Sequence, residues 1–122
     1  MGASAASAAA FYRDVVKAGE VWTIRDAEGF PTSTNASGET TMPFWSSRSR
    51  AMAIIRGSEA YREFHPTALR LDDFLESWLP GMQRDGLFVG LNWSGKRATG
   101  YDSRPEDVAA AIAHQRGGIP RA

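Results

Sequence analysis

The sequence predicts a single α+β domain in which a mainly antiparallel sheet of about five to six strands packs with about four helices. Three observations support this prediction. The 122 residues match the size of one domain, so residues 1–122 are treated as one unit. The hydrophobic share of 43% and the charged share of 23% are typical of globular proteins. Segments rich in strand-forming residues alternate with helical patterns, and most neighbouring strands are separated by turns too short for a parallel crossover.

The first element is a helix from about Ser4 to Ala18. Phe11 and Val15 lie four residues apart on one face of it, and Gly19 suits the left-handed position that ends a helix. The two ends of the chain, residues 1–6 and 117–122, are expected to be loose.

Three strands and two turns follow, and together they predict a β-meander: residues 21–24, 30–34 and 40–45. The turns are Asp26–Gly29 and Asn35–Gly38, both rich in residues that favour turns. Pro31 and Pro43 each remove one backbone donor, so we expect them at a strand end or at a sheet edge.

The middle of the chain predicts two helices with a short strand between them. Ser46 or Ser47 can cap a helix that reaches Arg56. Residues 67–71 read as a strand. Asp73, with Glu76 three residues later, resembles a capping box that opens the next helix, and Pro80 should kink or interrupt that helix.

The C-terminal third predicts the central strand, a hairpin and a last helix. The central strand has four apolar side chains on one face: Leu87, Val89, Leu91 and Trp93. Residues 94–97 turn the chain into a return strand over residues 98–101, which makes the hairpin. Ser103 and Glu106 form a second capping-box pattern, and Pro105 suits the first turn of the final helix.

Composition narrows the possible functions. Fourteen basic residues balance fourteen acidic ones, so the chain has no overall field that would attract nucleic acid or an anionic membrane. The absence of cysteine excludes disulfides, thiolate metal sites and a cysteine nucleophile. The histidines, His65 and His114, lie far apart, so we expect no metal site and no cofactor. No membrane segment is expected, and a cytoplasmic location is favoured.

Three stretches of the chain resemble a known family: residues 11–23 with Phe11-Tyr12 and Val21-Trp22-Thr23, residues 43–47 with Pro43-Phe44-Trp45-Ser46-Ser47, and residues 78–93 from Trp78-Leu79-Pro80-Gly81-Met82 to Gly90-Leu91-Asn92-Trp93. The family is the group of uncharacterised bacterial proteins called domain of unknown function 2750. The resemblance covers roughly residues 11–112. It implies a small bacterial protein without an assigned activity, and it assigns no catalytic residue.

The four tryptophans are the most informative side chains for a binding site. Trp22 and Trp78 lie on apolar faces and are predicted to be core residues. Trp45 and Trp93 each end a strand and are followed by a serine and then by basic residues, although simple packing remains the favoured explanation for both. The candidate binding residues are Trp45, Ser46, Arg48, Trp93, Ser94, Lys96 and Arg97.

The leading hypothesis is a non-catalytic accessory protein that binds a protein partner or a small anionic ligand near these tryptophans. The alternative is a small enzyme for an anionic substrate, in which Arg48, Lys96 and Arg97 hold the negative group and His65 or a carboxylate acts as the base. A nucleic-acid binder that stacks bases on tryptophan is disfavoured by the zero net charge. The oligomeric state stays open.

Overall fold

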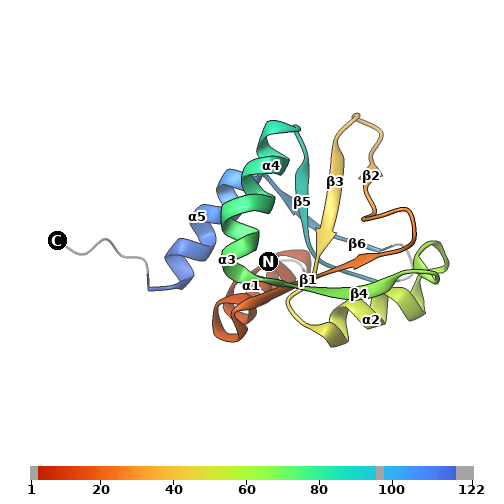
Figure 1. The fold of residues 1–122 in the computed structure, drawn as a ribbon, viewed down its shortest axis with the longest axis horizontal. Coiled ribbons are helices and arrows are strands. Elements are labelled where there is room, and N and C mark those ends of the chain that lie inside the picture. The colour runs from red at the N-terminus through yellow and green to blue at the C-terminus, as the bar shows by residue number, and fades with distance from the viewer. Residues whose placement is uncertain (1–2, 96–97, 118–122) are drawn as a thin grey trace.

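The computed structural model describes residues 3–95 and 98–117, and it confirms the α+β fold (Figure 1). Its strands are β1 (Glu20–Arg25), β2 (Ser33–Thr34), β3 (Thr40–Phe44), β4 (His65–Arg70), β5 (Phe88–Ser94) and β6 (Thr99–Ser103). Its separate helices are α1 (Ala3–Ala18), α2 (Arg48–Gly57) and α5 (Pro105–Gln115). Between α2 and α5, three segments form one continuous helix: α3 (Leu71–Asp73), a π-helical turn (Phe74–Trp78) and α4 (Leu79–Arg84). A 3-10 turn, Glu59–Tyr61, follows α2. Residues 3–6, which were expected to be loose, belong to α1, and residues 1–2 and 118–122 lie outside the described residues.

The strands form two sheets, and β5 is an interior strand of the larger one. The larger sheet has the order β2-β3-β5-β6, with β3 parallel to β5 and the other neighbours antiparallel. β1 and β4 form a separate antiparallel pair. The mainly antiparallel arrangement and the central position of β5 are therefore confirmed. The parallel β3–β5 pair was not predicted, because its crossover runs through every element from α2 to α4.

The predicted meander is wrong, because β1 does not continue into the sheet that contains β2 and β3. Along its whole length β1 pairs with β4. It meets the end of β3 at Trp22 and Trp45, where each backbone N–H donates to the other's carbonyl at 2.8 and 2.7 Å. The Thr23 hydroxyl of β1 also donates to the Pro43 carbonyl at 3.0 Å. After β1 the chain turns at Asp26–Gly29, which form an isolated bridge, and β2 then pairs with β3.

The helical stretch from Leu71 to Arg84 passes through Pro80 without breaking. Pro80 has no N–H and its ring would clash with the carbonyl four residues earlier in a regular α-helix. The residues just before Pro80 form a π-helical turn, in which the Leu79 N–H donates to the carbonyl of Phe74, five residues back. The predicted interruption is therefore a π-helical turn.

The start of α2 and the first-turn position of Pro105 agree with the sequence prediction, whereas the start of the 71–84 helix and both capping boxes differ. Ser47 caps α2 by accepting a hydrogen bond from the Arg50 N–H at 3.2 Å. Neither predicted capping box forms. The helix expected to start near Asp73 begins at Leu71, because the Leu71 N–H donates to the carbonyl of Gly19 at 2.9 Å and fixes the start through a tertiary contact. α5 begins at Pro105 without a side-chain cap.

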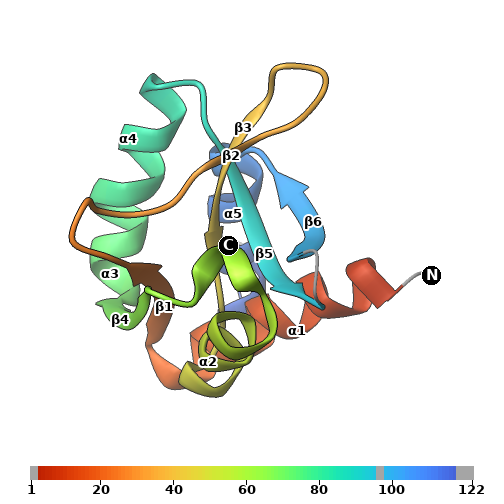
Figure 2. The same ribbon diagram turned by 90° about the vertical axis from the view of Figure 1, so that its right-hand side faces the viewer.

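The apolar interior consists of two clusters. The first core lies among α1, the 71–84 helix, α5 and the sheet, and its fully buried members include Phe11, Val15, Phe44, Phe74, Val89, Leu91, Val108 and Ile112. The second core lies between α2 and the ends of β1, β3 and β5, and it contains Ile24, Trp45, Ala51, Ile54, Ile55, Trp93 and Ala98. Figure 2 shows α2 at the end of the sheet toward which β5 runs. Trp45 and Trp93, two of the functional candidates predicted from sequence, therefore belong to the second core.

Candidate functional site

Trp45 and Trp93 come together because β3 and β5 are parallel neighbours, so the carboxyl ends of both strands reach the same edge. The Trp45 Nε1–H donates to the carbonyl oxygen of Trp93 at 2.8 Å. Trp45 is fully buried and Trp93 is 6% exposed, whereas Trp22 and Trp78, predicted as core residues, are only partly buried. Packing therefore explains all four tryptophans: Trp45 and Trp93 are core members, while Trp22 and Trp78 pack against the edges of the two cores.

Ser46 is also buried, and it is part of a hydrogen-bonded network with Asn92. The Ser46 N–H donates to Asn92 Oδ1 at 2.9 Å, and the Ser46 hydroxyl donates to Asp14 Oδ2 at 3.1 Å. The Asn92 Nδ2 group donates to Ser46 Oγ and to the carbonyl of Ser7, each at 3.1 Å. Asn92 has φ of 52°, a left-handed conformation that asparagine tolerates better than most residues. Ser46 therefore ties the two strand ends together.

Three features fix the orientation of the Trp93 indole. Its Nε1–H donates to Asp102 Oδ1 at 2.8 Å. Its ring lies against Gly90 and Gly100, where a Cβ atom would come within 2.5 and 2.8 Å of the ring. Only glycine fits at these two positions, so the indole occupies a slot built by the backbones of β5 and β6.

A cleft of about 350 Å³ lies between one face of α2 and the end of β5. We call it the α2–β5 cleft. Its described lining residues are Arg50, Ala53, Ile54 and Gly57 from α2, and Asn92, Trp93, Ser94 and Gly95 from β5 and the turn after it. Trp93 and Ile54 give the cleft apolar walls that the second core holds in place. Its described lining residues therefore form a preformed hollow with apolar walls and the guanidinium group of Arg50.

The seven residues predicted for the site do not all line the cleft. Trp93 and Ser94 line the cleft, while Trp45 and Ser46 are buried behind it. Arg48 is exposed and does not line it. Lys96 and Arg97 lie outside the described residues.

Arg50 is the cation that the sequence reasoning missed. It is two positions from Arg48, which places the two side chains about 200° apart around an α-helix. The spacing of residues 50, 53, 54 and 57 marks one helix face and is the signal that could have identified it. Among residues 3–95 and 98–117, ion pairs join Arg13 to Asp14 and Arg116 to Asp72, and Arg50 takes part in neither.

Comparison with protein families gives one decisive match. The model of the family described as protein of unknown function (DUF2750) matches residues 8–112. The chain belongs to the DUF2750 family. This match includes every described residue that lines the α2–β5 cleft, so the cleft is part of the DUF2750 domain.

Beyond the DUF2750 match, a search of curated proteins finds no significant relative. Among solved structures, Anabaena Tic22, described as a protein-transport protein, is similar with 14% sequence identity and a TM-score of 0.42. That alignment covers 66% of this DUF2750 chain and 44% of the Tic22 chain, so it spans less than half of that protein.

Ionisable groups elsewhere in the DUF2750 domain do not form a metal site within the described part of the chain. There, no three or more His, Asp or Glu residues are grouped so that they could hold a metal ion. In the same residues, every helix is too short or too polar to cross a membrane.

Two tyrosines have shifted pKa values. Burial raises the pKa of Tyr12 to about 12, with a hydrogen bond from Ser103 acting in the opposite direction, and burial also raises the pKa of Tyr61. Neither tyrosine lines the cleft.

Proposed function

We propose that this DUF2750 protein is a non-catalytic binding protein that holds a small anionic ligand with an apolar body in the α2–β5 cleft. The single observation that supports the proposal most is the lining itself, in which the Arg50 side chain stands beside the apolar walls of Ile54 and Trp93. A volume of about 350 Å³ is near the lower end for ligand pockets, so the ligand is small.

The charge of the cleft favours an anion. Arg50 is in neither ion pair found among the described residues, so its guanidinium group is available to a carboxylate or phosphate. A guanidinium group binds such groups through two parallel hydrogen bonds, which also orient the ligand. The apolar body would then pack against the Trp93 indole, which Asp102 holds in a fixed orientation.

Binding is favoured over catalysis by the chemistry of the lining. An enzyme acting on an anion needs a group that accepts or donates a proton at the reacting atom. The described lining residues include neither a carboxylate nor a histidine. His65, the base named in the alternative hypothesis, is exposed on β4 and is not part of the cleft.

The test compares two matched probes, 2-naphthoate and its uncharged amide, 2-naphthamide. We expect 2-naphthoate to shift the NMR signal of the Trp93 indole N–H and 2-naphthamide to bind much more weakly. Arg50→Gln should raise the Kd for 2-naphthoate by about tenfold, the value of one hydrogen bond to a charged group. Arg48→Gln is the matched control and should leave the Kd unchanged. Equal binding of the two probes, equal losses in the two variants, or binding of neither probe would contradict the proposal.

We also infer that the protein works in the cytoplasm of a bacterial cell. The lack of cysteine suits a reducing compartment. Detection of the protein in the periplasmic fraction of a bacterial host that carries its gene would contradict this inference.

A further inference from the structure

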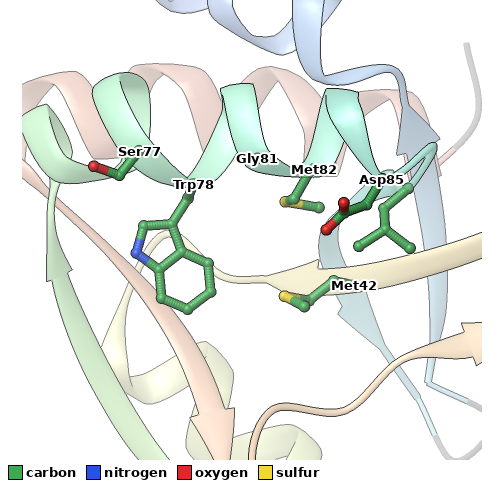
Figure 3. A pocket seen from close by; sticks show the side chains of 7 residues that line it. Met42, Ser77, Trp78, Gly81, Met82 and Asp85 are labelled. Atoms are coloured by element: carbon green, nitrogen blue, oxygen red, sulfur yellow. The ribbon is translucent and has the colours of Figure 1, made fainter.

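A second hollow lies along the helix that contains the π-helical turn, and it shares no lining residue with the α2–β5 cleft. We call it the Trp78 groove. It has a volume of about 280 Å³ and is lined by Met42, Ser77, Trp78, Gly81, Met82, Asp85 and Leu87 (Figure 3). Met42 comes from β3, Leu87 precedes β5, and the other lining residues come from the 71–84 helix and its C-terminal cap.

The walls of the groove are apolar, and the Trp78 wall is packed against two other aromatic rings. The Trp78 ring makes edge contacts with Phe30 and Phe44, with ring centroids 4.9 and 5.9 Å away. These contacts hold the indole, yet it stays only partly buried. Met42 and Met82 form the middle of the groove, and flexible thioether side chains adapt to apolar groups of different shape.

The groove is unfilled beside Gly81, because this residue has no side chain. A Cβ atom at Gly81 would meet only Arg84 Nη2, at 3.6 Å, which is an ordinary contact. Gly81 is in α4 and does not have a positive φ, so a larger residue is sterically allowed there. Glycine inside a helix lowers stability relative to alanine, and here its presence keeps the groove empty.

Asp85 is the charged side chain among the lining residues, and the Arg84 guanidinium lies beside Gly81 without an ion pair to Asp85. Asp85 is exposed, and Figure 3 shows its carboxylate turned toward the two methionines. Asp85 takes part in neither ion pair found between residues of the described ranges. A ligand that fills the groove would therefore place an apolar group between Trp78 and the methionines, and a positive group next to Asp85.

We propose that the Trp78 groove docks a segment of a partner protein that presents a large apolar side chain next to a lysine or arginine. The volume fits one large side chain and not a whole helix face. The carboxylate selects the neighbouring cation and disfavours an acidic segment. This proposal is independent of the α2–β5 cleft, which has the opposite charge.

The test selects random linear peptides on the full-length protein by phage display and then measures the Kd of the selected synthetic peptides. We expect the selected peptides to share an apolar residue next to a lysine or arginine. Gly81→Leu fills the groove and should weaken their binding by about tenfold or more. Gln83→Leu adds the same side chain to an exposed position of the same helix outside the groove, and should not weaken it.

The role of the Asp85 charge in peptide binding is tested with a second matched pair of variants. Asp85→Asn should weaken peptide binding roughly two- to fivefold at low salt, and less at high salt, as expected for an exposed ion pair. Asp73→Asn removes an exposed carboxylate of the same helix outside the groove and should have no effect. Binding should also survive Arg50→Gln, which separates this result from the proposed function.

Several outcomes would overturn the proposal. Selection of no peptide, selection of peptides without a basic residue, or equal binding to Gly81→Leu and wild type would each do so. Self-association of the protein that Gly81→Leu abolishes would assign the groove to a second copy of the chain instead.

Discussion

The α2–β5 cleft and the Trp78 groove each use one tryptophan as a wall, but they hold that tryptophan by different means. Trp93 donates a hydrogen bond to Asp102 and lies in a slot of two glycines. Trp78 is held by edge contacts with phenylalanine rings and faces two methionines. A hydrogen bond and a backbone slot fix one orientation, whereas apolar contacts leave room to adjust. We therefore expect the ligand proposed for the cleft to be restricted in shape and the side chains proposed for the groove to vary.

The largest expected difference between the two tryptophans is in stability. Trp93→Ala should lower the free energy of unfolding by roughly 3–5 kcal/mol, because it empties a buried site. Trp78→Ala should cost less, about 1–2 kcal/mol, because the indole is partly exposed and loses less burial. Urea unfolding of both variants measures the difference. An equal or larger loss for Trp78→Ala would mean that the groove tryptophan is a core residue after all.

The glycines beside the two tryptophans should respond to alanine in opposite directions. Gly90→Ala places a methyl group about 2.5 Å from the Trp93 ring and should cost roughly 1–3 kcal/mol through overpacking. Gly81→Ala meets no close contact within a helix and should raise stability by up to about 1 kcal/mol. Thermal unfolding of the two variants checks this. The comparison fails if both substitutions change the free energy of unfolding in the same direction.

The smallest expected effect concerns the hydrogen bond that the Trp93 indole donates to the Asp102 carboxylate. Asp102→Asn keeps an oxygen acceptor but removes its charge, so the loss of stability should stay below about 1 kcal/mol. The Trp93 indole N–H should nevertheless move upfield in the NMR spectrum, because a weaker acceptor deshields the proton less. The Trp78 indole signal serves as the internal control. A Trp93 signal that does not move would show that Asp102 does not orient the indole in solution.

Much of the fold could be predicted because it depends on local patterns. The apolar alternation from Leu87 to Leu91 identified β5, and the Ser46-Ser47 pair identified the start of α2, which Ser47 caps. The partner of β1 could not be predicted, because β4 lies on the far side of α2 in the sequence and pairing over such a distance depends on the whole core.

The candidate site was predicted in outline, and its details depended on contacts that residue spacing does not reveal. The strand ends that carry Trp45 and Trp93 do meet. Which tryptophans are buried depends on their Nε1 acceptors and on glycine slots, and both come from distant segments. Arg50 differs, because the helical spacing of the cleft residues was visible in the sequence.

The network around Asn92 also has a consequence for how the chain reaches its native state. Its side chain joins Ser46, 46 positions away, and Ser7, 85 positions away. Both long loops must close before these bonds can form, and contacts between residues so far apart raise the contact order and slow folding. The left-handed backbone at Asn92 gains its hydrogen-bonded partners only after those closures. The edge that carries the α2–β5 cleft is therefore expected to be completed late in folding, after the helices and hairpins have formed.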